Sequence, residues 1–114
     1  LIYAEACNKA EGSPNTLAYK CLNRVRDRAF GDQSHQYAGL TPEKFADAVF
    51  DEFGWENVFE FKRWFQLVRT EKVDEAIGKN AAIGARLNAN KENYLFPIPV
   101  RQCELRGWKN NPGY

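Results

Sequence analysis

Carboxylates spaced four residues apart are the side chains whose positions first suggest chemistry. Glu52, Glu56 and Glu60 follow one another at this spacing, with Asp51 beside them. On a helix such side chains lie one above another, so two of them could fall within the roughly 5 to 9.5 Å that separates the carboxyl groups of a glycoside hydrolase. Catalytic pairs face each other across a cleft, however, and nothing else in the sequence supplies one. We therefore expect no catalytic residue and no enzyme.

The same acidic stripe has a structural interpretation as one half of a set of ion pairs. Like charges four residues apart on a helix repel by roughly 0.2 to 0.5 kcal/mol per pair, so the stripe needs cations nearby. Arg24 and Arg28 are also four residues apart and could match it, whereas Arg26 belongs to another face of their helix. Arg63, soon after the last Glu of the stripe, is a second source of charge. We predict structural ion pairs among Arg24, Arg28, Glu52, Glu56, Glu60 and Arg63.

The single histidine and the three cysteines lack the pattern of a metal site. Cys7, Cys21 and Cys103 show no CxxC spacing, and His35 is far from all of them in the sequence. Tetrahedral zinc takes four ligands, usually in close pairs, so we predict no metal and no cofactor. Cys7 and Cys21 could form a disulfide between consecutive helices, but small core side chains are the favoured interpretation. His35 stands in the polar stretch 32–39, where a solvated side chain is expected.

The tryptophans offer rings that could stack on sugars. Trp55 and Trp64 stand inside helical apolar patterns and are predicted core residues, whereas Trp108 stands in the terminal loop. Trp108 is therefore the weak candidate for contact with a ligand or partner, and ligand-binding residues are otherwise unknown. Lys62 and Arg63 between aromatic residues resemble a nucleic-acid patch. Sixteen basic against fifteen acidic residues leave a net charge of +1, so no nucleic-acid partner is expected.

Positioning these side chains requires helices, and the first of them form residues 1–31. The length of 114 residues fits a single domain. A helix hairpin is predicted from residues 1–10 and 14–30, where Gly12 ends the first helix, Ser13 caps the second and Pro14 occupies its first turn. The buried stripe of the second helix is predicted to consist of Ala18, Leu22, Val25 and Ala29.

The central residues 41–78 carry the aromatic-rich stretch. Thr41 and Pro42 give the signal of a capped helix start. The stretch Asp51–Arg69 is predicted to be a buried helix at the centre of the fold, with a break near residues 60–62. A short helix follows from Val73, with Gly78 at its end.

The last residues, 79–114, are predicted to be a loop and a strap. Residues 79–93 are rich in Asn and favour a surface loop. The segment Tyr94–Val100 has prolines at positions 97 and 99, so it can be neither a helix nor a central strand and should lie extended. A turn-rich tail closes the chain. The fold class predicted for the whole is all-α.

The start of the chain suggests a piece of a longer protein. The sequence has no Met, and it opens in an apolar helical pattern without a capping residue. We expect any targeting or lipid-anchoring segment to lie upstream. Apolar surface exposed by such a cut favours self-association of the fragment. No run approaches the ~20 apolar residues of a membrane-spanning helix.

Four stretches together carry a resemblance to a known family. They are LIYAEACNKAEG with LNRVRDRAF, TPEKFADAVFDE, ENVFEFKRWFQLVRT, and YLFPIPVRQCEL with the final NNPGY. In this order they resemble the C-terminal portion of the SusD/RagB family, outer-membrane lipoproteins that bind nutrients, mostly glycans. The chain departs from the family pattern before the RWF run, where Phe61 stands in place of the usual Gly.

The resemblance implies both a fold and a role. Residues 1–114 would be a single C-terminal fragment, in which 1–31 form a TPR-like hairpin, 41–78 the central helices, and 79–114 the loop and strap. The full-length protein would be lipid-anchored through an upstream segment at the extracellular face of the outer membrane. It would deliver an oligosaccharide to a SusC-like TonB-dependent transporter. Family glycan contacts come mainly from upstream segments, so this fragment would be structural. The alternative is a TPR-like protein–protein interaction module.

Overall fold

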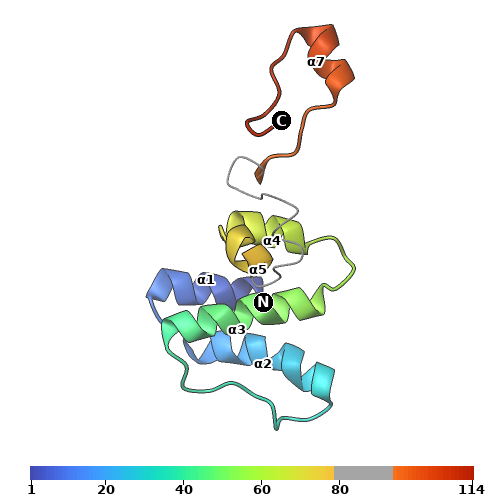
Figure 1. Ribbon diagram of the computed structural model, residues 1–114. Coiled ribbons are helices and arrows are strands. Elements are labelled where there is room, and N and C mark those ends of the chain that lie inside the picture. Colours follow the sequence, from blue (N-terminus) through green and yellow to red (C-terminus); the bar gives the residue numbers. More distant parts are fainter. Residues whose placement is uncertain (79–93) are drawn as a thin grey trace. The chain divides into compact units, whose positions relative to one another are not determined.

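The computed structural model describes residues 1–78 and 94–114. Within these ranges the chain is all helical, with six helices and no strand (Figure 1). This confirms the predicted fold class. The chain divides into two compact units, Leu1–Phe61 and Lys62–Tyr114. The loop predicted at residues 79–93 lies outside the described residues.

The first two helices begin and end close to the predicted positions. Helix α1 spans Ile2–Glu11 and α2 spans Thr16–Phe30. Each ends at a glycine in the left-handed conformation, Gly12 with φ 69° and Gly31 with φ 77°. Glycine takes this conformation without the steric cost that a Cβ atom imposes, which is why it stops a helix there.

The start of α2 differs from the prediction. Asn15, not Ser13, is the N-cap, because its side-chain oxygen accepts the Ala18 N–H at 2.8 Å. Pro14 therefore precedes the helix instead of occupying its first turn. An Asn is as good a cap as a Ser, so sequence alone does not choose between the two.

The long central helix predicted from Asp51 to Arg69 is two separate helices. Helix α3 spans Pro42–Glu56, with the Thr41 side chain as its cap, and α4 spans Arg63–Arg69. Between them the backbone turns through positive φ at Phe59 (65°) and at Phe61 (57°). Such angles cannot continue a right-handed helix. The break therefore begins a turn earlier than the sequence pattern suggested.

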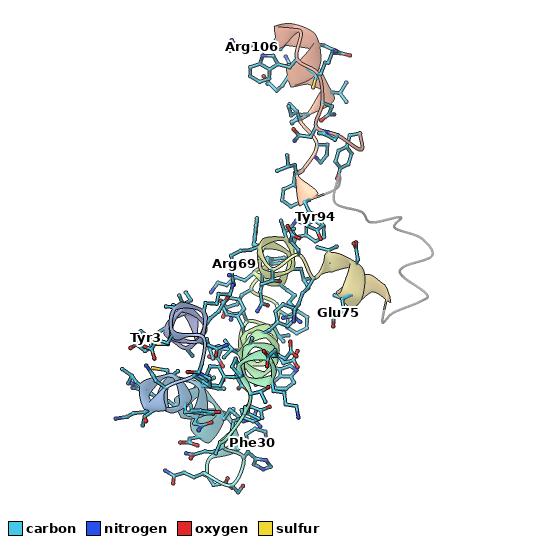
Figure 2. The ribbon with its side chains drawn as sticks, turned by 90° about the vertical axis from the view of Figure 1, so that its left-hand side faces the viewer. Tyr3, Phe30, Arg69, Glu75, Tyr94 and Arg106 are labelled. Carbon is cyan, nitrogen blue, oxygen red and sulfur yellow. The ribbon has the colours of Figure 1, made fainter. Side chains whose placement is uncertain are left out.

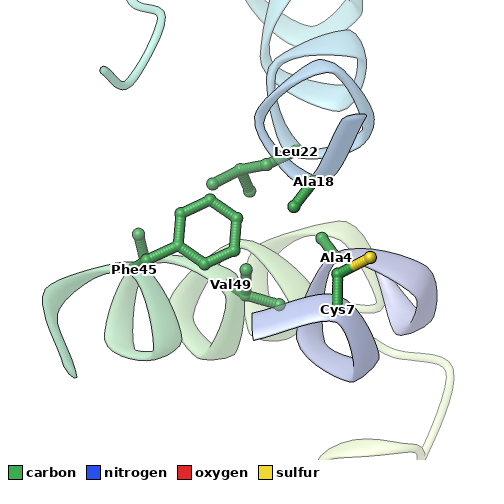
Figure 3. Packing of buried hydrophobic residues seen from close by; sticks show 7 residues of the cluster. Ala4, Cys7, Ala18, Leu22, Phe45 and Val49 are labelled. Atoms are coloured by element: carbon green, nitrogen blue, oxygen red, sulfur yellow. The ribbon is translucent and has the colours of Figure 1, made fainter. Parts of the chain in front are cut away.

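The core of the first unit is built where α1, α2 and α3 meet. Phe45 and Leu22 are fully buried, and the Phe45 ring points toward Leu22 (Figure 3). Tyr19 meets the Phe45 ring edge-on, with ring centres 4.9 Å apart. The buried cluster consists of Ala4, Cys7, Ala18, Leu22, Phe45, Ala48 and Val49. Burial of two such large side chains is worth about 1.5 to 3 kcal/mol each, so this cluster is the main source of packing energy in the unit.

Residues 32–41 run back along α2, and side chains of α2 form hydrogen bonds with the backbone of this segment. The Asn23 side chain donates to the Tyr37 carbonyl at 2.9 Å and accepts the Tyr37 N–H at 2.9 Å, as a strand neighbour would. The Tyr19 hydroxyl does the same for Leu40, accepting its N–H at 2.6 Å. Because later residues of the segment meet earlier residues of α2, α3 starts beside the beginning of α2. The two helices therefore run in the same direction.

The second unit contains α4, then α5 from Val73 to Gly78, and α7 from Val100 to Arg106. The short helix from Val73 was predicted, but α7 was missed when residues 79–114 were assigned to loop and strap. Its sequence signals are Pro99 at the start and Gly107, with φ 64°, at the end. None of the described helices is both long enough and apolar enough to cross a membrane.

The proline-containing strap is held by two asparagines from the tail. Asn110 accepts the Ile98 N–H at 2.7 Å and donates to the Ile98 carbonyl at 3.2 Å. Asn111 donates to the Phe96 carbonyl at 2.6 Å. A strap flanked by prolines has few N–H groups to offer a sheet, so side-chain amides take the place of a neighbouring strand.

Candidate functional site

A buried arginine, Arg26, forms the most constrained polar site of the first unit. Its Nη1 donates to Glu52 Oε2 at 2.7 Å, joining α2 to α3. Arg26 is 8% exposed and Glu52 is 4% exposed. Removing two charges from water is costly, so each of them depends on the other and on further hydrogen bonds.

The rest of the Arg26 guanidinium is satisfied by the segment that follows α2. Its Nε donates to the His35 carbonyl at 2.6 Å. Its central carbon lies 4.2 Å from the centre of the Tyr37 ring and 5.2 Å from that of Phe30. His35 in turn stacks on Phe30, which lies at the end of α2 (Figure 2). We call Arg26, Glu52, Tyr37, Phe30 and the His35 backbone the arginine clamp. It is a fixed, internally neutralised arrangement.

The sequence analysis chose the wrong arginine of α2 for this position. It paired Arg24 with the acidic stripe and placed Arg26 on another face. In the structure Arg24 is exposed and the buried row runs through Ala18, Leu22 and Arg26. This row keeps a spacing of four residues, whereas the predicted row moved to Val25 and Ala29. Only the fold reveals that the row ends in a charge, since a buried arginine has no distinctive sequence signal.

Two residues of the predicted ion-pair set, Arg28 and Glu56, form an ion pair at the surface. Arg28 Nη2 donates to Glu56 Oε2, and the two side chains are 64% and 35% exposed. Glu60 is exposed and lies beyond the end of α3, so it does not stack above Glu56 as a continuous helix would require. Arg63 lies in the second unit, where it donates to the side chain of Gln66 at 2.5 Å.

The ion pairs of Glu52 and Glu56 indicate a structural role for the acidic stripe. Glu52 and Glu56, the two members of the four-residue series that lie on α3, each accept a hydrogen bond from a guanidinium group. The stripe thus joins α2 to α3 and has the character of a structural element.

The cysteines are free thiols, and one of them is part of the core. Cys7 is buried in the hydrophobic cluster, while Cys21 and Cys103 are partly buried. The hydrogen bond to Cys7 raises the pKa of the Tyr3 hydroxyl above its usual value. Over residues 1–78 and 94–114, no group of His, Cys, Asp and Glu is arranged to hold a metal ion.

Two of the tryptophans, Trp55 and Trp64, lie nearer the surface than predicted. Trp55 is 59% exposed, which contradicts its assignment to the core. The buried row of α3 consists of Phe45, Ala48, Val49 and Glu52, so Trp55 lies one turn beyond the packed segment. Trp64 is partly buried, and its ring centre lies 6.1 Å from that of Phe96. Trp108 is 55% exposed, with the Arg106 guanidinium carbon 5.9 Å from its ring centre.

Comparison with known proteins places the chain beside a single family. A family model described as the SusD family matches residues 1–114. SusD-like protein P2 of Formosa agariphila is 34% identical over 125 residues, which cover 100% of this chain and 24% of that protein. SusD-like protein P25 of the same organism is 37% identical over 107 residues, which cover 93% of this chain and 20% of that protein. The chain thus spans about a quarter or less of the length of these relatives. No solved structure matches it significantly.

Proposed function

The chain belongs to the SusD family, and on this premise we propose that it is the C-terminal helical part of a protein that binds nutrient oligosaccharides at the cell surface. The observation that carries the proposal is the match of the family model over the whole chain, residues 1–114. It is supported by the all-helical fold. In this role the chain is a binding component and performs no catalysis.

We assign this part of the protein a structural role. Its best-defined polar site, the arginine clamp, is neutralised internally and offers no open group to a sugar. Helices α1 and α2 serve as a TPR-like hairpin, and α3 to α5 as the central helices of the same domain. The principal oligosaccharide site lies in sequence upstream of these residues. Trp108, exposed in the tail, is proposed for direct contact with a ligand or partner.

The proposal extends to a location and a partner. The full-length protein would be anchored by a lipid to the outer membrane and would face the outside of the cell. It would pass the captured oligosaccharide to a SusC-like TonB-dependent transporter. Both features follow from the family resemblance of the sequence, and neither depends on the geometry of the arginine clamp.

The experiment that tests this role compares the chain with a chimera. In the chimera, this chain replaces the matching segment of SusD-like protein P2. Neutral oligosaccharides are first screened against the parent P2, and any that binds is titrated calorimetrically into P2, into the chimera and into the isolated chain. We expect P2 and a folded chimera to bind with similar affinity and the chain not to bind. Tight binding of a neutral oligosaccharide by the chain alone would overturn the structural assignment.

Exposed aromatic residues near the end of the first unit favour a second candidate function, a protein-interaction module. Phe59 is 94% exposed, Phe61 is 90% exposed, and Trp55 and Val58 are more than half exposed. Clustered apolar side chains of this kind commonly mark contact surfaces. Sedimentation of the chain over a range of concentrations tests this candidate. Self-association that Phe59→Ser reduces would support it, and a monomer at every concentration would exclude self-association.

A further inference from the structure

A polar hollow lies beside α2, next to the arginine clamp. Its volume is about 470 Å³. It is formed between α2 and the segment that runs back along this helix. Its lining residues are Thr16, Lys20, Asn23, Arg24, Asp27, Gln33 and Gln36. All seven side chains are polar or charged, and they are positioned within one compact unit of the fold.

The hollow contains two cations and one carboxylate, Asp27, so its lining carries a net charge of +1. Lys20 and Arg24 are four residues apart on α2, and both are exposed. No ion pair joins either of them to a carboxylate among residues 1–78 and 94–114. Two like charges at this spacing repel by roughly 0.2 to 0.5 kcal/mol, and an anion between them would remove that repulsion.

The one acid of the hollow is hydrogen-bonded to a neutral amide and keeps its negative charge. Both carboxylate oxygens of Asp27 accept from the Gln36 amide, each at 2.9 Å. The amide thereby ties the carboxylate to the segment opposite the helix. Asn23, in the floor, is 8% exposed and is hydrogen-bonded on both sides to the Tyr37 backbone. Asn23, Asp27 and Gln36 are thus held in place by hydrogen bonds. Lys20 and Arg24 remain exposed and can contact a ligand.

We propose that this hollow binds the acidic group of a charged oligosaccharide, a sugar carboxylate or a sulfate ester. The proposal rests on the proposed function, because it takes the ligand to be an oligosaccharide. Lys20 and Arg24 would hold the acidic group, since hydrogen bonds from cations to anions are stronger than neutral ones. Thr16 and Gln33 would offer a hydroxyl and an amide to the sugar hydroxyl groups. The lining residues include no aromatic ring, so stacking does not supply the affinity and a neutral sugar gains little.

Calorimetry on the intact chain tests the proposal with defined probes. The probes are trigalacturonate, a sulfated carrageenan disaccharide, neutral cellotriose and inorganic sulfate. We expect at least one of the two acidic sugars to bind, and the comparison between them distinguishes carboxylate from sulfate ester. The affinity should fall when the salt is raised from about 0.05 M to about 0.5 M, because exposed charges are screened. Cellotriose and inorganic sulfate should bind at least about tenfold more weakly, a difference of about 1.4 kcal/mol.

Matched variants identify the side chains responsible. The double variant Lys20→Gln, Arg24→Gln should lose at least about tenfold in affinity for the acidic sugar. Lys44→Gln removes an exposed cation from α3 and should leave the affinity unchanged. Circular dichroism verifies that both variants keep their helices. Equal binding by the double variant, or equal affinity for cellotriose or inorganic sulfate, would overturn the proposal, as would no binding of either acidic sugar. The proposed function would survive that result, because its own test uses the chimera and neutral oligosaccharides.

Discussion

The two units of the chain are stabilised in different ways. In Leu1–Phe61 three helices enclose a hydrophobic cluster, and a buried ion pair links two of them. In Lys62–Tyr114 much of the described apolar surface is exposed, including Phe65, Leu95, Phe96 and Leu105. There the strap is held mainly by asparagine side chains bonded to backbone groups.

The difference shows which part of the sequence specifies its own packing. A hydrophobic cluster contributes stability in proportion to the apolar area removed from water, whereas a single hydrogen bond contributes only about 0.5 to 1.5 kcal/mol. The first unit therefore has the larger local source of stability. The second unit has a defined backbone, but among its described hydrophobic side chains only Val73 is buried.

The largest expected change in the free energy of unfolding comes from a comparison of two phenylalanine substitutions, one in each unit. Phe45 is fully buried in the first unit, whereas Phe65 in the second is 63% exposed. We expect Phe45→Ala to cost about 3 to 5 kcal/mol of unfolding free energy, because it leaves a cavity in the core. Phe65→Ala should cost about 1 kcal/mol or less, through the lost edge contact with Phe96. Urea unfolding followed by circular dichroism measures both. Equal costs would contradict the contrast between the units.

The next effect contrasts two ion pairs within the first unit. Glu52→Gln removes the charge that faces buried Arg26, and about 3 kcal/mol should be lost because that arginine stays buried without a counter-charge. Glu56→Gln acts on an exposed pair and should cost about 0 to 1 kcal/mol. The free energy of unfolding of each variant is the measurement. If the exposed pair proved the costlier to break, the arginine clamp would not be the main polar link between α2 and α3.

A smaller effect is expected in the second unit. Asn110→Ala removes both hydrogen bonds to Ile98 and should cost about 0.5 to 1.5 kcal/mol per bond. The readout is local: hydrogen exchange at the Ile98 amide should become faster. Lys109→Ala, at the adjacent exposed residue, is the control and should leave that exchange rate as it is. Unchanged exchange in Asn110→Ala would mean that the strap is held by other contacts.

The smallest expected effect is a stabilisation of the chain, whereas the substitutions above destabilise it. Phe61 has φ 57° and is 90% exposed, so its backbone is strained without any gain from burial. Phe61→Gly should stabilise the chain by about 1 kcal/mol or less, since glycine adopts this conformation freely but also loosens the unfolded chain. Phe61→Ala keeps the Cβ atom and should not stabilise. Equal thermal midpoints for the two variants would show that the ring, not the backbone, determines the effect.

Local signals in the sequence predicted much of the fold. Gly12 and Gly31 end helices where expected, and Thr41 with Pro42 begins one. These residues act through backbone geometry and capping, which depend on neighbours in the chain. Helix α7 also has a proline at its start, Pro99, and a glycine at its end, Gly107. It was nevertheless missed, because the prolines before it suggested only an extended strap.

The candidate site was less predictable, as Arg26 shows. Its sequence neighbours Arg24 and Arg28 are equally charged, and only the packing of α2 places Arg26 on the buried row. Its partners come from Glu52, Tyr37 and the His35 backbone, which lie 9 to 26 residues away in the chain. No local rule specifies such a set.

The sequence by itself thus determined the helical class, the main helix ends and the family, because these follow from residue patterns that a single chain displays. The tertiary structure alone decided which charges are buried and which aromatic rings remain in solvent. It paired Arg26 with Glu52, exposed Trp55, and left Lys20 and Arg24 facing an open hollow. The physical reason is that burial is a property of the whole packed unit, since a side chain leaves water only when distant segments cover it.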